Sequence, residues 1–228
     1  MKYTRYSGLV YLPVILIILL ISFFLTGSFN EHIISSCITD LNRNGEIETI
    51  RLVGGNRRFG EYLTITEYEQ VIFRIDLTSL KPWKVQIADV DGDGEKELSI
   101  SVYKTTRSDP EMKKRPFIYD WGEKGIHPKW LGSRLSRPFD DYIFCDLDED
   151  GMDELIAIEN LVDGTKLLNA YKWKGFGFEG LCESPAYLDI RELEVNLEGG
   201  EPPVAVIREN NRWKSVVIHY EEDTIILK

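Results

Sequence analysis

Three nine-residue segments carry acidic side chains at a spacing suited to holding a cation. They begin at Asp40, Asp89 and Asp146 and share the pattern D-x-[DN]-x-[DN]-G-x-x-E. In such a loop the side chains at positions 1, 3 and 5 turn inward, and the glycine at position 6 permits a sharp turn. A backbone carbonyl at position 7 and an acid at position 9 complete an oxygen cage for a hard cation.

Calcium is the expected ion, because flexible oxygen-rich loops suit its large coordination number better than that of magnesium. Two loops offer four carboxylates and the first offers only two, so charge alone predicts that the first loop binds most weakly. Ordinary Asp/Asn-Gly turns on an acidic surface are the alternative. The predicted metal residues are Asp40, Asn42, Asn44, Glu46 and Glu48; Asp89, Asp91, Asp93, Glu95 and Glu97; and Asp146, Asp148, Asp150, Met152 and Glu154.

The acidic segments are one marker of an internal repeat. With a worn fourth copy at 196–200, their starting positions are separated by 49, 57 and 50 residues. A second marker keeps nearly the same period, since Tyr68, Tyr119, Tyr171 and Tyr220 are separated by 51, 52 and 49 residues. Two markers in register indicate four copies of one structural unit.

Each unit has the pattern of short β-strands. Leu98, Ile100 and Val102 alternate with polar or aromatic residues, which is the period of a half-buried strand. Four strands per repeat of about 50 residues are typical of a propeller blade. We therefore predict an all-β fold for residues 31–228: a small β-propeller, with four blades of four strands. Half of a larger assembled ring is the structural alternative.

At the acidic loops the chain resembles the FG-GAP/VCBS repeats of integrin-alpha-type propellers. The resemblance covers essentially all of residues 31–228. It implies that each loop joins the first and second strands of a blade and binds calcium through positions 1, 3, 5 and 9. The chain departs from the family in having Glu at position 9 and no Gly-Ala-Pro tripeptide after the loops. The family serves mostly in adhesion and ligand binding, and some members are attached to enzymes.

Residues 1–30 predict a membrane-directed helix. Lys2 and Arg5 precede an uncharged run from Tyr6 to Asn30, and Glu31 follows it. The positive-inside rule then places residues 31–228 outside the cytoplasm. We expect a retained single-pass anchor in the cell membrane, because the apolar run is longer than the core of a usual signal peptide. Cleavage near Thr26–Ser28, followed by secretion, is the alternative.

Composition excludes several classes of protein. The chain is 43% hydrophobic, too apolar for disorder, and its three cysteines are too few for a disulfide framework. With 38 acidic and 27 basic residues its net charge is −11, which disfavours nucleic acid as a partner. His32, His127 and His219 are far apart, and no hydrolase or phosphate-loop motif occurs. We therefore recognise no catalytic constellation.

A basic face is expected opposite the acidic loops. The segments that should join strands two and three, and those that should join blades, hold 16 Lys/Arg against 10 Asp/Glu. One of these segments, an enlarged loop from Lys104 to Pro116, is especially basic. A solvated charged surface is the alternative to a ligand site. The candidate ligand residues are Arg57, Arg58, Arg107, Lys113, Lys114, Arg115, Arg134 and Arg137.

These observations favour an extracytoplasmic calcium-binding propeller that acts as an interaction module at the cell envelope. Its expected partners are the membrane, through the N-terminal helix, and an anionic polysaccharide or an acidic protein. An accessory domain of an envelope enzyme complex is the first alternative, and a polysaccharide-active hydrolase or lyase is the second. For the basic face we expect that Lys113, Lys114 and Arg115 changed together to serine weaken binding without lowering thermal stability.

Overall fold

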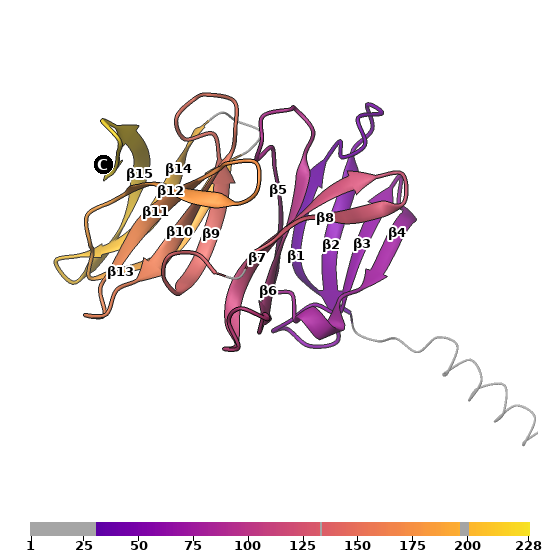
Figure 1. The fold of residues 1–228 in the computed structure, drawn as a ribbon, viewed down its shortest axis with the longest axis horizontal. Helices are drawn as coiled ribbons and strands as arrows, with labels where there is room; N and C mark the ends of the chain where they lie inside the picture. The colour runs from indigo at the N-terminus through magenta and orange to yellow at the C-terminus, as the bar shows by residue number, and fades with distance from the viewer. Residues whose placement is uncertain (1–30, 133, 197–200) are drawn as a thin grey trace, which may run out of the picture.

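The computed structural model describes residues 31–132, 134–196 and 201–228, which form four antiparallel sheets of four strands each (Figure 1). Within every sheet the strands pair in the order in which they follow one another in the chain. The result is a four-bladed β-propeller, which confirms the predicted all-β fold and the number of blades and strands.

Blades 1 and 2 are joined by a short 3-10 helix, η1 (Thr78–Leu80). The strands of blade 1 are β1 (His32–Thr39), β2 (Glu48–Gly54), β3 (Tyr62–Glu67) and β4 (Gln70–Asp76). The strands of blade 2 are β5 (Lys84–Ala88), β6 (Glu97–Lys104), β7 (Lys113–Gly122) and β8 (Gly125–Leu131).

Blades 3 and 4 repeat the same meander. The strands of blade 3 are β9 (Phe139–Cys145), β10 (Glu154–Asn160), β11 (Lys166–Trp173) and β12 (Phe178–Glu183). The strands of blade 4 are β13 (Asp189–Asn196), β14 (Glu201–Glu209), β15 (Arg212–Glu221) and β16 (Thr224–Leu227).

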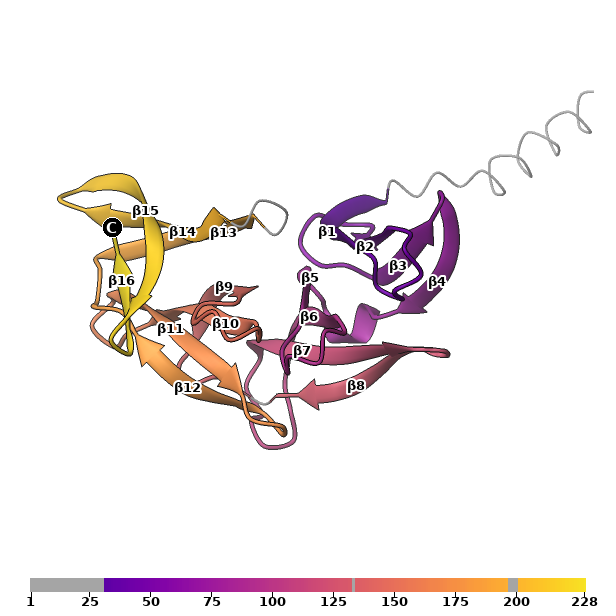
Figure 2. The same cartoon turned by 90° about the horizontal axis from the view of Figure 1, so that it is seen from above.

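The hydrophobic core lies between successive blades. Seen from above, β1, β5, β9 and β13 are the inner strands, and β4, β8, β12 and β16 are the outer ones (Figure 2). Separate clusters of buried side chains join blade 1 to 2, blade 2 to 3 and blade 3 to 4. Figure 2 shows β13 and β1 apart, and among the described residues no such cluster joins blade 4 to blade 1.

Strand β6 differs from the half-buried strand that its alternation predicts, because both of its faces are covered. Leu98, Ile100 and Val102 are fully buried, and so are Ser99 and Ser101. The two serine hydroxyls lie 2.8 and 2.6 Å from the hydroxyl of Tyr142 in blade 3. The small polar residues of this alternating strand therefore face a neighbouring blade and not solvent.

The structure corrects two predictions, one about the length of the basic loop in blade 2 and one about the recurring tyrosines. Lys113, Lys114 and Arg115 lie on strand β7, so the connection after β6 is only residues 105–112. Tyr119 and Tyr171 are buried strand residues, but Tyr68 is 68% exposed with a φ of 47°, in the turn between β3 and β4. The tyrosine spacing therefore reports the period of the repeat without marking one equivalent position in every blade.

The predicted N-terminal helix (residues 1–30) and most of the worn fourth acidic copy (residues 197–200) lie outside the described residues. Among the residues that the structure describes, no helix is both long and apolar enough to span a bilayer.

Candidate metal centres in the acidic loops

The three acidic loops occupy the same place in successive blades. They join β1 to β2, β5 to β6 and β9 to β10, so all three lie at one end of the propeller. This position is the one that the resemblance to FG-GAP/VCBS repeats implies.

The loops share one backbone conformation. Position 6 is a glycine with φ of 88°, 81° and 90° in the three loops, as the motif predicts. Position 4 is also left-handed, which the motif does not reveal. Its residues are Arg43 (φ 59°), Gly92 (φ 73°) and Glu149 (φ 60°). Two left-handed residues in one short loop explain the tight turn.

Side chains at positions 1 and 5 hold the turn together by accepting backbone hydrogen bonds. Asp40 Oδ2 and Asp146 Oδ2 each accept from the amide of the position-6 glycine at 3.0 Å. Asp93 Oδ1 and Asp150 Oδ1 accept from the amide two residues ahead, at 2.7 and 3.1 Å. The acidic residues therefore shape the loops in addition to any role as ligands.

The glutamate at position 9 is buried beneath each loop and accepts a hydrogen bond from the start of the same loop. Glu48, Glu97 and Glu154 are at most 2% exposed. Their Oε2 atoms accept from the position-2 amides of Leu41, Val90 and Leu147 at 2.7, 2.9 and 2.9 Å. The sequence signal for this contact is a buried apolar residue at position 2 together with Glu at position 9. The motif by itself predicts only a metal-binding role for that glutamate.

Positions 1, 3 and 9 converge in the second and third loops. One carboxylate oxygen from each of Asp89, Asp91 and Glu97 lies within 4.8 Å of the others, and the same holds for Asp146, Asp148 and Glu154. Among the described atoms, Asp91 Oδ1 and Asp148 Oδ1 are buried and accept no hydrogen bond. Buried carboxylate oxygens without a donor are suited to a cation, so these clusters fit a metal ion.

The other predicted ligands are less closely gathered. Asp93 at position 5 is exposed and lies outside the second cluster, and Asp150 lies outside the third. The position-7 residues are exposed (Glu46, Glu95) or partly buried (Met152), as expected where the backbone carbonyl is the intended ligand.

Lysine ammonium groups lie in both clusters. Lys172 Nζ is 2.7 Å from Asp148, 2.6 Å from Asp150 and 2.9 Å from Glu154. Lys129 Nζ is 2.6 Å from Asp91, and it also pairs with Glu97 and with Asp120. Burial raises the pKa of Glu97 and of Glu154, and the neighbouring ammonium group opposes the shift in each case. Sequence spacing did not reveal these lysines, because they come from later strands.

The first loop is built with amides in place of lysine. Asn42 Nδ2 donates to Glu48 Oε1, and Asn44 Nδ2 donates to Glu67 Oε1 at 2.7 Å. No lysine forms an ion pair with Asp40 or Glu48 among the described residues. Burial raises the pKa of Glu48, and the charges of Glu67 and Asp40 add to the shift. Asp40 Oδ1 is buried and accepts no hydrogen bond from a described residue.

Neighbouring loops are also linked to one another. The amide of Asp89 donates to Asp153 Oδ2 at 2.7 Å, and the amide of Asp153 donates to the Asp89 carbonyl at 2.7 Å. Between the first two loops, Arg43 Nη2 donates to the Gly94 carbonyl at 2.6 Å. The acidic end is therefore one continuous structure across blades 1, 2 and 3.

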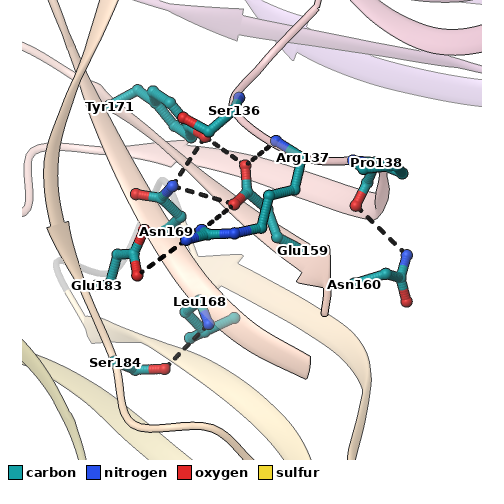
Figure 3. Close-up of polar contacts among 10 residues, drawn as sticks. All are labelled: Ser136, Arg137, Pro138, Glu159, Asn160, Leu168, Asn169, Tyr171, Glu183 and Ser184. Atoms are coloured by element: carbon teal, nitrogen blue, oxygen red, sulfur yellow. Dashed lines mark hydrogen bonds and ion pairs between the residues drawn. The ribbon is translucent and has the colours of Figure 1, made fainter. Parts of the chain in front are cut away.

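At the opposite end, several of the predicted ligand residues are engaged within the protein. Arg137 Nη1 is 2.9 Å from Glu159, which is fully buried, and 2.7 Å from Glu183 (Figure 3). Glu159 also accepts from Tyr171 Oη and Asn169 Nδ2, so Arg137 completes a buried polar network (Figure 3). This arrangement anchors the connection between blades 2 and 3.

Arg115 is fully buried, so the prediction that it belongs to an exposed ligand surface is wrong. Its position on β7 points it under the 105–112 connection, where it pairs with Asp109 at 3.2 Å. Lys113 pairs with Asp109 and Glu111, and Lys114 donates to the Asp140 carbonyl. The exposed members of the set are Arg57, Arg58, Arg107 and Arg134, and none of them forms an ion pair with a described residue.

A pocket of about 270 Å³ opens at this end between blades 2 and 3. Tyr103, Lys114, Arg134 and Arg137 contribute to its lining. Arg134 is exposed and forms no ion pair with a described residue, whereas Asp140, which also lines the pocket, is paired with Lys166. Arg134 therefore contributes an unpaired positive charge to this pocket.

No protein-family model matches the chain, and no curated protein matches it. The likeness to FG-GAP/VCBS repeats therefore stays a proposal that rests on the three acidic loops and on their place in the blades.

Proposed function

We propose that this chain is a calcium-binding β-propeller of the FG-GAP/VCBS type, which acts as an interaction module outside the cytoplasm and is held at the cell membrane by residues 1–30. The observation that carries the calcium part is the convergence of carboxylates at positions 1, 3 and 9 in two loops. Buried oxygens without hydrogen-bond donors support a cation there, because such atoms cost free energy until they are neutralised.

A binding role is favoured over hydrolysis by what the acids contact. A carboxylate pair for glycoside hydrolysis must face a substrate. Here Glu97 and Glu154 are buried, accept from backbone amides and pair with lysines. Their contacts are those of residues that build a loop.

Calcium titration tests the proposal. A site with a dissociation constant of about 10⁻⁴ M in about 1 mM calcium adds about 1.4 kcal/mol of stability. We expect EGTA to lower the melting temperature of the full chain by several degrees, and calcium to restore it. Glu123→Gln removes an exposed acid outside the three loops and serves as the control. Its melting temperature should respond to EGTA and calcium as that of the wild type does. A melting curve that ignores both chelator and calcium would refute the proposal.

The basic end is the proposed docking surface for an anionic partner, such as a polysaccharide or an acidic protein. His32, the first residue of β1, pairs with Gly54, which directly precedes the connection that contains Arg57 and Arg58. The chain therefore enters the propeller at this end. If residues 1–30 anchor the chain, the same end faces the membrane and its anionic polymers and headgroups.

Binding to anionic surfaces tests this second part. The full chain should bind soluble anionic polysaccharide, or vesicles with anionic headgroups, more strongly than neutral ones, and salt should weaken the binding. Arg57→Ser, Arg58→Ser and Arg134→Ser combined should reduce it. Lys124→Ser, in the exposed turn between β7 and β8, is the control. Equal binding by both variants would show that the face is only solvated surface.

A further inference from the structure

The two lysines of the acidic clusters reach equivalent loops by different routes. Lys172 comes from β11, the third strand of blade 3, and Lys129 comes from β8, the fourth strand of blade 2. Their side chains are only 8% and 15% exposed. Two unrelated positions place an ammonium group on the same part of the loop, and both do so in loops with four carboxylates, which indicates that the positive charge offsets this acidic excess.

The first loop shows the opposite arrangement at the corresponding position. Lys172 directly follows Tyr171, which pairs with the position-10 residue Leu155. In blade 1 the position-10 residue Thr49 pairs with Thr66, and Glu67 follows. Blade 1 therefore has an acid where blade 3 has a lysine.

An ammonium group and a divalent cation would compete for the same oxygens. Lys172 already contacts oxygens at positions 3, 5 and 9 of its loop, three of the four side-chain positions that a calcium ion would use. Two cations at contact distance from the same carboxylates also repel each other. Calcium can therefore occupy the third loop only after the lysine has withdrawn, which its long flexible side chain permits.

We propose that Lys129 and Lys172 are built-in counter-cations, which neutralise the second and third loops in the absence of metal and must be displaced before a divalent ion binds there. Among the described residues the first loop has no such competitor, so it binds calcium most readily. This inference rests on the proposed calcium binding and sets its order among the loops. It reverses the order that the number of carboxylates alone predicts.

Reciprocal substitutions test the proposal in the full chain, with calcium chloride as the titrant and calorimetry as the readout. Lys172→Met should raise the calcium affinity of one site at least tenfold and lower the melting temperature in EGTA. Glu67→Lys places an ammonium group in the first loop, so it should weaken one site at least tenfold. Lys174 is an exposed lysine directly after β11, so Lys174→Met is the matched control and should change neither quantity.

The outcomes separate this inference from the proposed function. If the wild type binds calcium and Lys172→Met alters neither its affinity nor its melting temperature in EGTA, the inference fails and calcium binding stands. If neither protein binds calcium but Lys172→Met melts earlier, displacement and the proposed calcium function both fail, and only the counter-cation role is supported. Lys129→Met provides a second, independent loop for the same comparison, should Lys172→Met fail to fold.

Discussion

Replacing Arg115 with methionine should destabilise the propeller, although the sequence places this residue among surface cations. The side chain is fully buried on β7. Its guanidinium donates to the carbonyl oxygens of Lys104, Asp109 and Glu111 at 2.8, 3.2 and 2.9 Å. Arg115 therefore holds the whole 105–112 connection against the blade.

The expected loss follows from these contacts. A hydrogen bond from a charged donor contributes about 1.5–3 kcal/mol. Water can reach Glu111, which is exposed, so we count only the contacts to Lys104 and Asp109 as fully lost. At the lower value, Arg115→Met should lower the free energy of unfolding by about 3 kcal/mol, because methionine keeps much of the apolar packing.

Urea unfolding of the full chain measures this loss, and a thermal scan should show a fall of about 6–12 °C for a domain of this size. Arg115→Lys should give an intermediate value, because it keeps the charge and loses the planar fork. Arg107→Met, on the exposed part of the same connection, should stay within about 0.5 kcal/mol of wild type. If Arg115→Met also unfolds within that margin, the contacts do not hold the connection as described.

The burial of Arg115 also changes the prediction for the triple serine variant of the basic face. The sequence alone predicts that changing Lys113, Lys114 and Arg115 together to serine leaves thermal stability unchanged. Because Arg115 is buried and Lys114 lies 4.5 Å from the ring centre of Trp83, the triple variant should lose stability along with any binding. Only exposed arginines can separate the two effects.

Three further predictions concern other parts of the fold. Tyr142→Phe should cost about 1–2 kcal/mol in urea unfolding, because it leaves two buried serine hydroxyls of β6 without their partner; an unchanged value would mean that water replaces the phenol. Burial, with a smaller contribution from the charges of Asp89 and Asp146, raises the pKa of Asp153, so ionisation of this carboxyl lowers the stability of the folded state relative to the unfolded chain at neutral pH. Asp153→Asn should therefore be more stable than wild type at pH 7 in EGTA, and it should lose this advantage as the pH falls through the raised pKa of Asp153 toward about 4, the value of an unfolded aspartate; a difference that stays constant from pH 7 to about 4 would contradict the assignment. Gly151→Ala should cost about 1 kcal/mol because its φ is 90°, whereas Gly180→Ala, also without close neighbours but without a positive φ, should cost nothing; equal melting temperatures would show that the loop relaxes.

The sequence predicted the fold well because two independent sets of residues, the acidic loops and the tyrosines, recur with nearly the same period. Acidic loops at Asp40, Asp89 and Asp146 mark the first turn of three blades, and strand alternation supplies the rest. Strand ends were less accurate. Basic residues such as Lys113 look like a loop in sequence, but β7 begins there because its backbone pairs with β6 up to Lys104. Pairing of backbone groups, which composition does not reveal, decides where a strand starts.

The sequence predicted the geometry of the acidic loops, but it did not predict the lysines that neutralise two of them. The pattern at positions 1 to 9 is local, so the turn and the inward carboxylates follow from spacing alone. Lys129 and Lys172 lie 32 and 18 residues beyond the last acid of their loops and come from different strands. Cross-strand neighbours of this kind become visible only once the register is known.

The positions of the cations separate residues that hold the propeller together from residues left for a partner. Lys129 and Lys172 each pair with three carboxylates. Arg115 pairs with a buried aspartate, so all three charges are neutralised inside the protein. A partner that approaches from solvent can gain only from charges that are not already neutralised. Within the described ranges Arg57 and Arg134 are such charges, and both lie at the end where the chain enters the first blade. Substitutions in the two sets of cations should therefore have different effects. Substituting a cation that is paired inside the protein should lower the free energy of unfolding. Substituting an exposed arginine should weaken attachment to an anionic surface while the melting temperature stays the same.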